Sequence, residues 1–579
     1  LMRLRLLPLL LLAAVAACKD GPTDPSFSTT NYQVGEEYSF NVQAGEGKLC
    51  SEADRDMRRG RVVAITQRAV VIADVNNPAG GYSDAEYRRF GQQFDELVWP
   101  VTVANFGEPY DIDENERVVI FFTRAVNELT PRNQTWFVGG FFTARDLFPP
   151  QRTRRLDACA GTNYGEILYM LVPDPQGAVN NNVRSKDGEL RNTVAVLGHE
   201  FQHLINASRR LYSGRALGTD WNEEVWLNEG LSHIAEELLG HGAGKLAPRQ
   251  NIDLDRLVST EELRDVFSAF HGSNFDRLRR YYENPDTASL IGADRLATRG
   301  AIWQFLRYAA DRKGGSEPSF WRGLIDSGSG GLANLRTALG AEPMDWIQDW
   351  TVAIYTDDAV PNVAAAYQQP SWNFRSVYFG FVVSGQPLRR YPLLTRTLAE
   401  GVETSVSIRA GSAAYLRFRV APGARAELRT AAAAPSCQPA GPARDLAIGE
   451  VIALTGSQTE VVCVNGGAEG GEFAYIPFNA AATGSRIVNV SGTGLLPPAA
   501  GTLALADRGL NARADARLAE LLRPAEESWE MQLRERELRE LGPRVGGTSP
   551  ADPGGMAPRS VSFQTSAVNE LRVSIVRIR

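Results

Sequence analysis

The chain has 579 residues and a formal net charge of −7, and 22% of its residues are charged. This length suits about three or four domains, and the composition is that of a folded globular protein. The acidic balance argues against nucleic-acid binding, which requires a basic face.

The first residues are typical of a targeting segment. Two arginines precede an apolar run, Leu6 to Ala17, that is too short to span a bilayer. The run ends in Val-Ala-Ala-Cys, which resembles a bacterial lipobox with Cys18 as the lipidated residue. The resemblance implies a lipoprotein signal peptide over residues 1–18 and a lipid anchor at a bacterial membrane or cell surface. Ordinary secretion with cleavage nearby is the alternative, and both routes place the mature protein outside the cytoplasm.

Four cysteines remain after Cys18. In an oxidising compartment an even number indicates disulfides. Their order along the chain favours the pairs Cys50–Cys159 and Cys437–Cys463. The sequence has no C-x-x-C motif, which argues against a cysteine zinc site or a thioredoxin-like motif.

Residues 19–35 are polar and are interpreted as a tether. The next region, residues 36–190, mixes strand patterns with one clear helix. Ser83 and Glu86 form a capping box, and we expect the helix that follows to end near Val98. β-branched or aromatic runs bounded by turn residues predict strands at Arg61 to Thr66, Ala69 to Val75, Val118 to Thr123 and Glu166 to Val172.

The segment Asp111 to Asn115 places side-chain oxygens at alternate positions, as the start of a calcium loop does. It lacks the glycine and the distal glutamate of an EF-hand. The pattern favours a polar turn, and Ca²⁺ is kept as a secondary hypothesis.

His199, Glu200 and His203 form an H-E-x-x-H motif in a segment with helical periodicity. Residues four apart lie only about 40° apart on one helical face, so both imidazoles can face one metal ion. We expect this helix to begin at Asn192 or Thr193. Its buried stripe consists of Val194, Leu197, Phe201, Leu204 and Ile205, which argues against a surface helix with two solvated histidines.

A second helical pattern follows from Trp226 to Leu239, and Gly240 and Gly242 are interpreted as its end. It begins with Trp-Leu-Asn-Glu-Gly, in which the glutamate is Glu229. The two segments together resemble the gluzincin metallopeptidases, in which a glutamate on the next helix completes the zinc site. The longer gap and the Asn-Glu-Gly-Leu-Ser string are most similar to the hyicolysin-type neutral metallopeptidases.

The resemblance implies that Zn²⁺ is held by His199, His203 and Glu229, with the fourth position open to water. Glu223 and Glu224 fit a shorter gap to the motif but lack the Asn-Glu-Gly context, and we expect them near the start of the helix.

His233 lies four residues after Glu229, where thermolysin-like members carry an aspartate that supports a ligand histidine. It is interpreted as a similar support with a role in catalysis, as a core histidine, or as a fourth ligand. A fourth protein ligand would close the site to water, so the first two are favoured.

The resemblance implies a zinc-dependent endopeptidase that acts on protein or peptide substrates, with Glu200 as the general base. The chain lacks the Gly-x-Met-Glu-Asn string with which gluzincin aminopeptidases bind the substrate amine. The sequence does not choose an oxyanion donor among His271, Tyr281 and Tyr282. The alternative function is a catalytically inactive relative that acts as a surface binding protein through its β-domain, but a pure metal site has no need of Glu200.

Two segments are candidates for the walls of the substrate cleft. The strand Glu166 to Leu171 is interpreted either as the cleft edge, where its backbone pairs with an extended peptide, or as a core strand. The aromatic segment Trp136 to Phe142 is a candidate for the same cleft.

The sequence as a whole predicts an α+β fold. The resemblance implies a thermolysin-like catalytic domain, with a mixed sheet in residues 36–190 and a helical half in residues 191–357. Short strands with Gly, Pro and Ser turns predict a β-sandwich-like domain over residues 358–500. Residues 501–579 contain a charged helical stretch expected to be solvated, a Gly/Pro linker, and a last strand expected to pair with the β-domain. The sequence gives no indication of the oligomeric state.

Overall fold

The computed structural model describes most of the chain. Residues 1–26, which include Cys18, and nearly all of residues 501–569 lie outside the described part. No helix within the described part is long and apolar enough to cross a membrane. The described residues are 27, 29–45, 47–132, 134, 136–213, 221–383, 385–430, 436–437, 443–496, 533, 536–537, 539–541 and 570–579.

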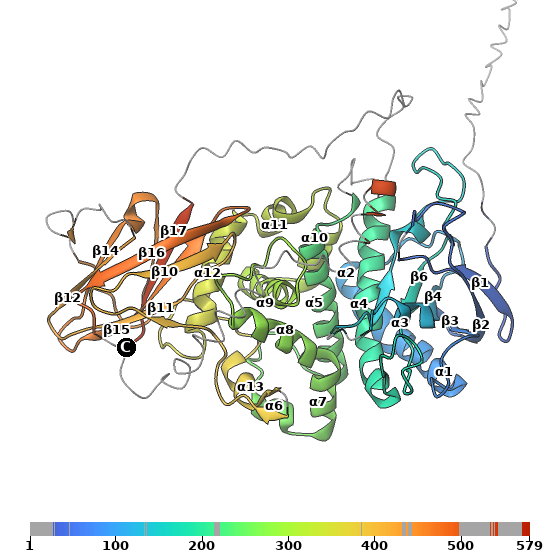
Figure 1. Cartoon of the computed structure of the whole chain (residues 1–579), viewed down its shortest axis with the longest axis horizontal. Helices are drawn as coiled ribbons and strands as arrows, with labels where there is room; N and C mark the ends of the chain where they lie inside the picture. The colour runs from blue at the N-terminus through green and yellow to red at the C-terminus, as the bar shows by residue number, and fades with distance from the viewer. Residues whose placement is uncertain are drawn as a thin grey trace, which may run out of the picture.

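Helices and sheets are both present, as the α+β prediction requires. Figure 1 shows a sheet at the N-terminal end, a block of helices in the middle and the later strands at the other end. The first sheet has the order β1-β2-β3-β4-β6-β5, with β4 parallel to both β3 and β6. Its strands are β1 (Glu37–Asn41), β2 (Met57–Ile65), β3 (Ala69–Asp74), β4 (Val118–Phe122), β5 (Gly140–Phe142) and β6 (Ile167–Met170).

The interpretation of Glu166 to Leu171 as the cleft edge is wrong. Strand β6 lies between β4 and β5, and its backbone pairs on both sides. Among the described strands, β5 is the last one of this sheet, and it belongs to the aromatic segment after Trp136. A three-residue strand gives a weak periodic signal, so the sequence did not reveal it.

The helix after Ser83 begins as predicted, with both hydrogen bonds of the capping box present. It continues beyond the expected end at Val98, because a π-helical turn joins two α-helices. The three parts are α1 (Asp84–Gln93), η1 (Phe94–Val98) and α2 (Trp99–Phe106).

Helix α4 (Lys186–Tyr212) carries the H-E-x-x-H motif, and helix α5 (Val225–Gly244) packs beside it (Figure 1). The predicted start of α4 at Asn192 or Thr193 is wrong. Ser185 is the N-cap, and its hydroxyl accepts a hydrogen bond from the amide of Gly188. Thr193 lies inside the helix, where its hydroxyl donates to the carbonyl of Glu189.

The predicted end of α5 at Gly240 and Gly242 is also wrong, because the helix continues to Gly244 and ends at a left-handed Lys245. Gly240 instead allows close packing. A Cβ atom on Gly240 would collide with the ring of His271 and lie 2.9 Å from the Cβ of Phe270. Close packing against the π-helical turn η4 (Phe267–His271) therefore requires a glycine at this position, whereas the helix end does not.

Helices fill the middle of the chain, as the sequence predicts. They include α6 (Leu254–Val258), α7 (Glu261–Val266), α8 (Gly272–Tyr282), α9 (Leu296–Lys313), α10 (Glu317–Ile325), α11 (Gly331–Leu339), α12 (Pro343–Thr356) and α13 (Phe374–Gly380). Helices α8 and α9 pack on each other, and α9 also packs on α5. This packing places α9 next to the residues that follow Glu229.

The later strands form two larger sheets, of order β10-β16-β12-β14 and β13-β17-β15-β11-β9. Both sheets contribute side chains to one hydrophobic cluster. The last strand pairs with β13 and β15, which agrees with the expected pairing of the chain end. The strands are β9 (Arg396–Thr397), β10 (Thr404–Arg409), β11 (Leu416–Val420), β12 (Arg425–Arg429), β13 (Val451–Thr455), β14 (Val461–Asn465), β15 (Gly471–Asn479), β16 (Ser485–Thr493) and β17 (Leu571–Arg577).

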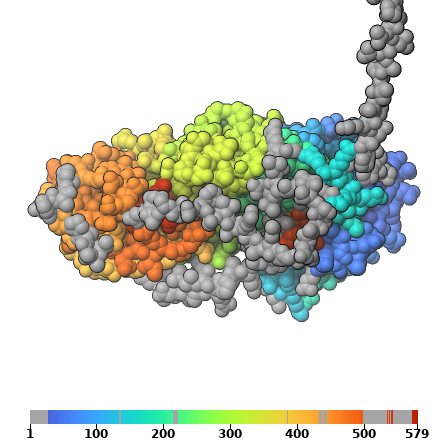
Figure 2. Space-filling view, turned by 90° about the horizontal axis from the view of Figure 1, so that it is seen from above, coloured from blue at the N-terminus to red at the C-terminus, as the bar shows by residue number. Residues whose placement is uncertain are grey.

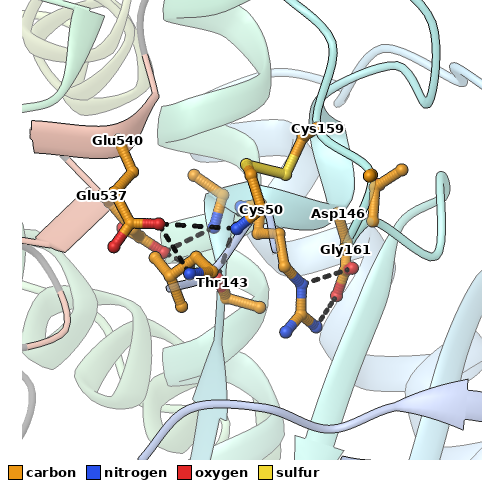
Figure 3. The surroundings of a disulfide bond; sticks show 12 residues. Cys50, Thr143, Asp146, Cys159, Gly161, Glu537 and Glu540 are labelled. Atoms are coloured by element: carbon orange, nitrogen blue, oxygen red, sulfur yellow. Dashed lines mark hydrogen bonds and ion pairs between the residues drawn. A yellow bond between two sulfur atoms is a disulfide. The ribbon is translucent and has the colours of Figure 1, made fainter. Parts of the chain in front are cut away.

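Some of the described residues between 533 and 541 are buried, contrary to the expectation that this charged stretch is solvated. Leu533 and Glu537 are buried, and the carboxylate of Glu537 accepts hydrogen bonds from the hydroxyl of Thr143 and the amide of Ala144, both at 2.8 Å (Figure 3). Glu540 accepts from the amide of Leu49 at 2.6 Å. Figure 2 shows a small red patch of this segment beside the blue and cyan N-terminal half. Backbone amides of the N-terminal half thus compensate these carboxylates.

Both cysteine pairs favoured by the sequence are disulfides in the structure. Cys50 is bonded to Cys159, next to the contact that Glu540 makes (Figure 3). Cys437 is bonded to Cys463. The first bond joins two positions 109 residues apart and ties the β1–β2 connection to the segment before β6. A bond across such a long segment restricts the unfolded chain strongly.

We predict that Gly240→Ala destabilises the protein by about 1–3 kcal/mol, because the added methyl group collides with His271 in a packed interior. Urea denaturation measures the change. Gly323→Ala on helix α10 is the matched control, because a Cβ atom there meets nothing within 4 Å. The control should gain up to about 1 kcal/mol from helix propensity. Equal midpoints for the two variants would contradict the packing role of Gly240.

Candidate metal centre

The two histidines of the motif face the same carboxylate. Nε2 of His199 lies 3.3 Å from Glu229 Oε2, and Nε2 of His203 lies 3.4 Å from Glu229 Oε1. One potential ligand atom from each residue lies within 4.8 Å of the other two. Two imidazole nitrogens and one carboxylate oxygen are the ligands of a common type of catalytic zinc site, so this donor set fits zinc.

Glu223 and Glu224, the alternatives to Glu229 as the third ligand, lie away from the two histidines. Glu223 is fully buried. It forms an ion pair with Arg210 at 2.6 Å and accepts a hydrogen bond from the side chain of Asn334 at 2.6 Å. Glu224 is the N-cap residue of α5, and its carboxylate accepts from the indole of Trp226. Of the three glutamates considered, the structure brings only Glu229 to the histidines.

The other nitrogen of each histidine ring is held by a supporting residue. Nδ1 of His199 is 2.8 Å from Glu236 Oε1, and Nδ1 of His203 is 3.1 Å from the amide oxygen of Asn228. Such partners fix the ring orientation, and a neutral ring held in this way presents the Nε2 lone pair to a metal. Asn228 and Glu236 come from α5, the helix that also carries Glu229.

Sequence reasoning missed Glu236, which takes the supporting role considered for His233. The signal was present: Glu236 follows Glu229 by seven residues, and this spacing of about two turns puts both carboxylates on one face of α5. Glu236 is itself held by the side-chain amide of Asn274, at 2.9 Å.

His233 is fully buried and lies beside Glu236, with its Nδ1 at 3.2 Å from Glu236 Oε1. Burial lowers the pKa of His233 to about 3, although Glu236 acts in the opposite direction. The ring is therefore neutral at physiological pH. His199, His233 and Glu236 form a second group with metal-binding potential, which shares His199 with the first.

Neighbouring charges shift the pKa values of the residues at this site. Burial alone would lower the pKa of His199, but its contacts with Glu229 and Glu236 outweigh burial and raise the pKa to about 10. Burial would raise the pKa of Glu229, but Arg299, 3.0 Å away, and His203 hold it well below its usual range. The carboxylates of this buried site are thus ionised, as metal ligands must be.

A groove reaches His199 and Glu200. Its walls include Trp136, Phe137 and Gly140 on the side of strand β5, and Arg277 and Arg299 on the side of α8 and α9. The aromatic segment predicted for the cleft therefore does line it. A Cβ atom on Gly140 would lie 3.2 Å from Cγ of Glu200, so the glycine lets the edge strand pass close to that side chain.

The three oxyanion donors considered from the sequence do not line this groove. His271, Tyr281 and Tyr282 are each fully buried, and the ring of His271 packs 4.9 Å from that of Trp372. The cationic groups at the groove are instead Arg277 and Arg299.

Comparison with known proteins agrees with a metal-dependent peptidase. No protein-family model matches the chain. The chain is similar to the neutral metalloprotease ShpI of Staphylococcus hyicus, with 26% identity over 156 residues. The match covers 27% of this chain and 31% of the relative, so the chain matches less than a third of that protein. This similarity supports a relationship to metallopeptidases.

We predict that Glu229→Gln loses zinc on dialysis, whereas Glu223→Gln retains one equivalent, because only Glu229 faces both imidazoles. Atomic absorption on folded, monodisperse protein measures the metal. Glu223→Gln controls for the loss of a buried charge, since it breaks the pair with Arg210. Glu236→Gln should weaken zinc binding by about 10- to 100-fold. Retention of zinc by Glu229→Gln together with its loss from Glu223→Gln would reassign the ligand.

Proposed function

We propose that this protein is a zinc-dependent endopeptidase. The proposal rests on the convergence of His199, His203 and Glu229 beside a groove that His199 and Glu200 line. The similarity to a neutral metalloprotease supports the same reaction class. A zinc ion held by these three residues would supply a Lewis acid that activates water and polarises the scissile carbonyl.

Glu200 is the proton carrier in this proposal. It follows His199 directly on α4 and lines the groove, so its carboxylate is placed beside the metal ligands without being one of them. It accepts a proton from the attacking water and passes it to the nitrogen of the leaving amine. Because residue 140 of strand β5 is a glycine, no side chain of that residue crowds Glu200.

The lining of the groove supports a peptide as the substrate. Gly140 of β5, the last strand of the first sheet within the described part of the chain, lines the groove next to Glu200. Trp136 and Phe137 offer apolar surface to the side chains of a bound peptide.

The groove also offers two cations for the developing oxyanion. Arg299 is the closer to the metal ligands, since its guanidinium is 3.0 Å from Glu229. A fixed donor near the scissile carbonyl stabilises the negative charge of the tetrahedral transition state. We assign this role to Arg299 in preference to the fully buried His271.

We predict that Glu200→Gln lowers the rate of cleavage of an unfolded, fluorescently labelled protein by at least about 100-fold while zinc content stays at one equivalent. The change removes the proton acceptor and keeps the side-chain size. Glu262→Gln, an exposed residue on α7, is the matched control for the charge change and should retain full activity. Equal cleavage by Glu200→Gln and wild type would contradict the mechanism. Absence of cleavage by zinc-loaded wild type would favour the inactive, surface-binding alternative.

We further propose that lipidation of Cys18 anchors the enzyme outside the cytoplasm. Cys18 lies outside the described residues, so the support is the lipobox-like Val-Ala-Ala-Cys string. We predict that Cys18→Ser releases the protein from the membrane fraction, because a single polar residue replaces several acyl chains. Fractionation followed by immunoblotting measures the partition. Unchanged membrane association of the variant would contradict the anchor.

A further inference from the structure

Three carboxylates away from the candidate zinc centre form a further group of possible metal ligands. They lie at the start of strands β4 and β6. Asp111 and Asp113 belong to the turn before strand β4, and Glu166 directly precedes strand β6. One oxygen from each of the three carboxylates lies within 4.8 Å of the others. The turn was predicted from the sequence, but its contact with Glu166 was not.

Two of these carboxylates have a buried oxygen without a partner. Glu166 is 3% exposed and Asp113 is 8% exposed. Glu166 Oε1 accepts from the amide of Ile112 at 2.9 Å, and Asp113 Oδ2 accepts from the side chain of Asn115 at 2.6 Å. Among the described residues, the remaining oxygens, Glu166 Oε2 and Asp113 Oδ1, have no hydrogen-bond partner.

Burial of such oxygens is costly unless something compensates them. Burial and the neighbouring Asp111 raise the pKa of Asp113 to about 7, and burial and Asp113 raise the pKa of Glu166 well above its usual range. Both shifts have the sign expected of acidic groups that face each other without a cation. A divalent cation would supply the missing compensation.

The donor set selects the type of cation. All three side chains offer oxygen, and none offers nitrogen or sulfur, which favours a hard ion such as Ca²⁺ over zinc. Calcium binds oxygens at about 2.4 Å, so two oxygens on one ion lie at most about 4.8 Å apart. The spacing of the three carboxylates meets this limit. Magnesium holds its oxygens closer and in a stricter octahedral geometry.

We propose that Asp111, Asp113 and Glu166 form a calcium site that joins the turn before β4 to the start of β6. Strands β4 and β6 are parallel neighbours, paired at Val119 and Ile167, so the ion ties together the beginnings of both. Strand β6 in turn carries the edge strand β5, which borders the groove. The site therefore stabilises the sheet that supports the groove and takes no part in the chemistry.

The test measures thermal unfolding of the full chain with and without calcium. Protein carrying Glu200→Gln is used throughout to prevent self-cleavage, zinc is held constant, and calcium is first removed on a chelating resin. We expect 5 mM CaCl₂ to raise Tm by at least about 2 °C, as binding to the folded state alone requires. The same concentration of MgCl₂ should have a smaller effect. No calcium-dependent shift, or an equal shift with magnesium, would overturn the proposal.

Three variants locate the ion. Asp113→Asn and Glu166→Gln should each lose the calcium-dependent shift, and without calcium each should be at least as stable as the parent protein, because an uncompensated buried acid has been removed. Glu114→Gln is the matched control, since this exposed neighbour undergoes the same charge change and should keep the full shift.

Direct binding is followed with terbium, a calcium substitute whose emission is excited by nearby tyrosines. Tyr164 and Tyr212 line a pocket together with Asp113. Emission that calcium displaces, and that is lost in Asp113→Asn, would support the site. A calcium shift retained by both Asp113→Asn and Glu166→Gln would place the ion elsewhere and overturn the proposal. The outcome is independent of zinc binding, so it does not depend on the peptidase mechanism.

Discussion

The close packing of α4, α5 and α9 is the constraint on which the proposed metal centre depends. At each contact a glycine lies next to a proposed metal ligand. Gly198 precedes His199, and a Cβ atom there would collide with Leu239 of α5. Gly230 follows Glu229, and a Cβ atom there would lie 2.5 Å from Cγ1 of Ile302 on α9. Larger residues would push the helices apart and separate the carboxylate from the imidazoles.

This packing concentrates charge in a buried space, and the chain compensates it with specific partners. Glu229 is paired with Arg299, and Glu236 with His199 and Asn274. Buried charges require such partners, since an unpaired charge in the interior costs several kcal/mol. The same network orients both histidine rings, because each Nδ1 is occupied and each Nε2 faces Glu229. Stability and ligand geometry thus depend on the same contacts.

Local patterns predicted much of this arrangement. The helical spacing of His199 and His203 and the Asn-Glu-Gly context of Glu229 identified three residues that the structure brings together. Local periodicity also predicted the strands and helices that contain long periodic runs. The failures concern contacts between distant segments, which periodicity does not encode. They include the edge position of β5, the role of Gly240 and the burial of Glu537 against Thr143. Glu236 was missed although it lies two turns after Glu229 on the same face of α5.

We expect the metal to lie between His199, His203 and Glu229, and not in the group of His199, His233 and Glu236. Diffraction from zinc-loaded crystals of the Glu200→Gln protein, recorded on both sides of the zinc absorption edge, tests this most directly. We expect one anomalous peak within coordination distance of both Nε2 atoms and of a Glu229 oxygen. A peak between His199, His233 and Glu236, or no peak at either position, would contradict it.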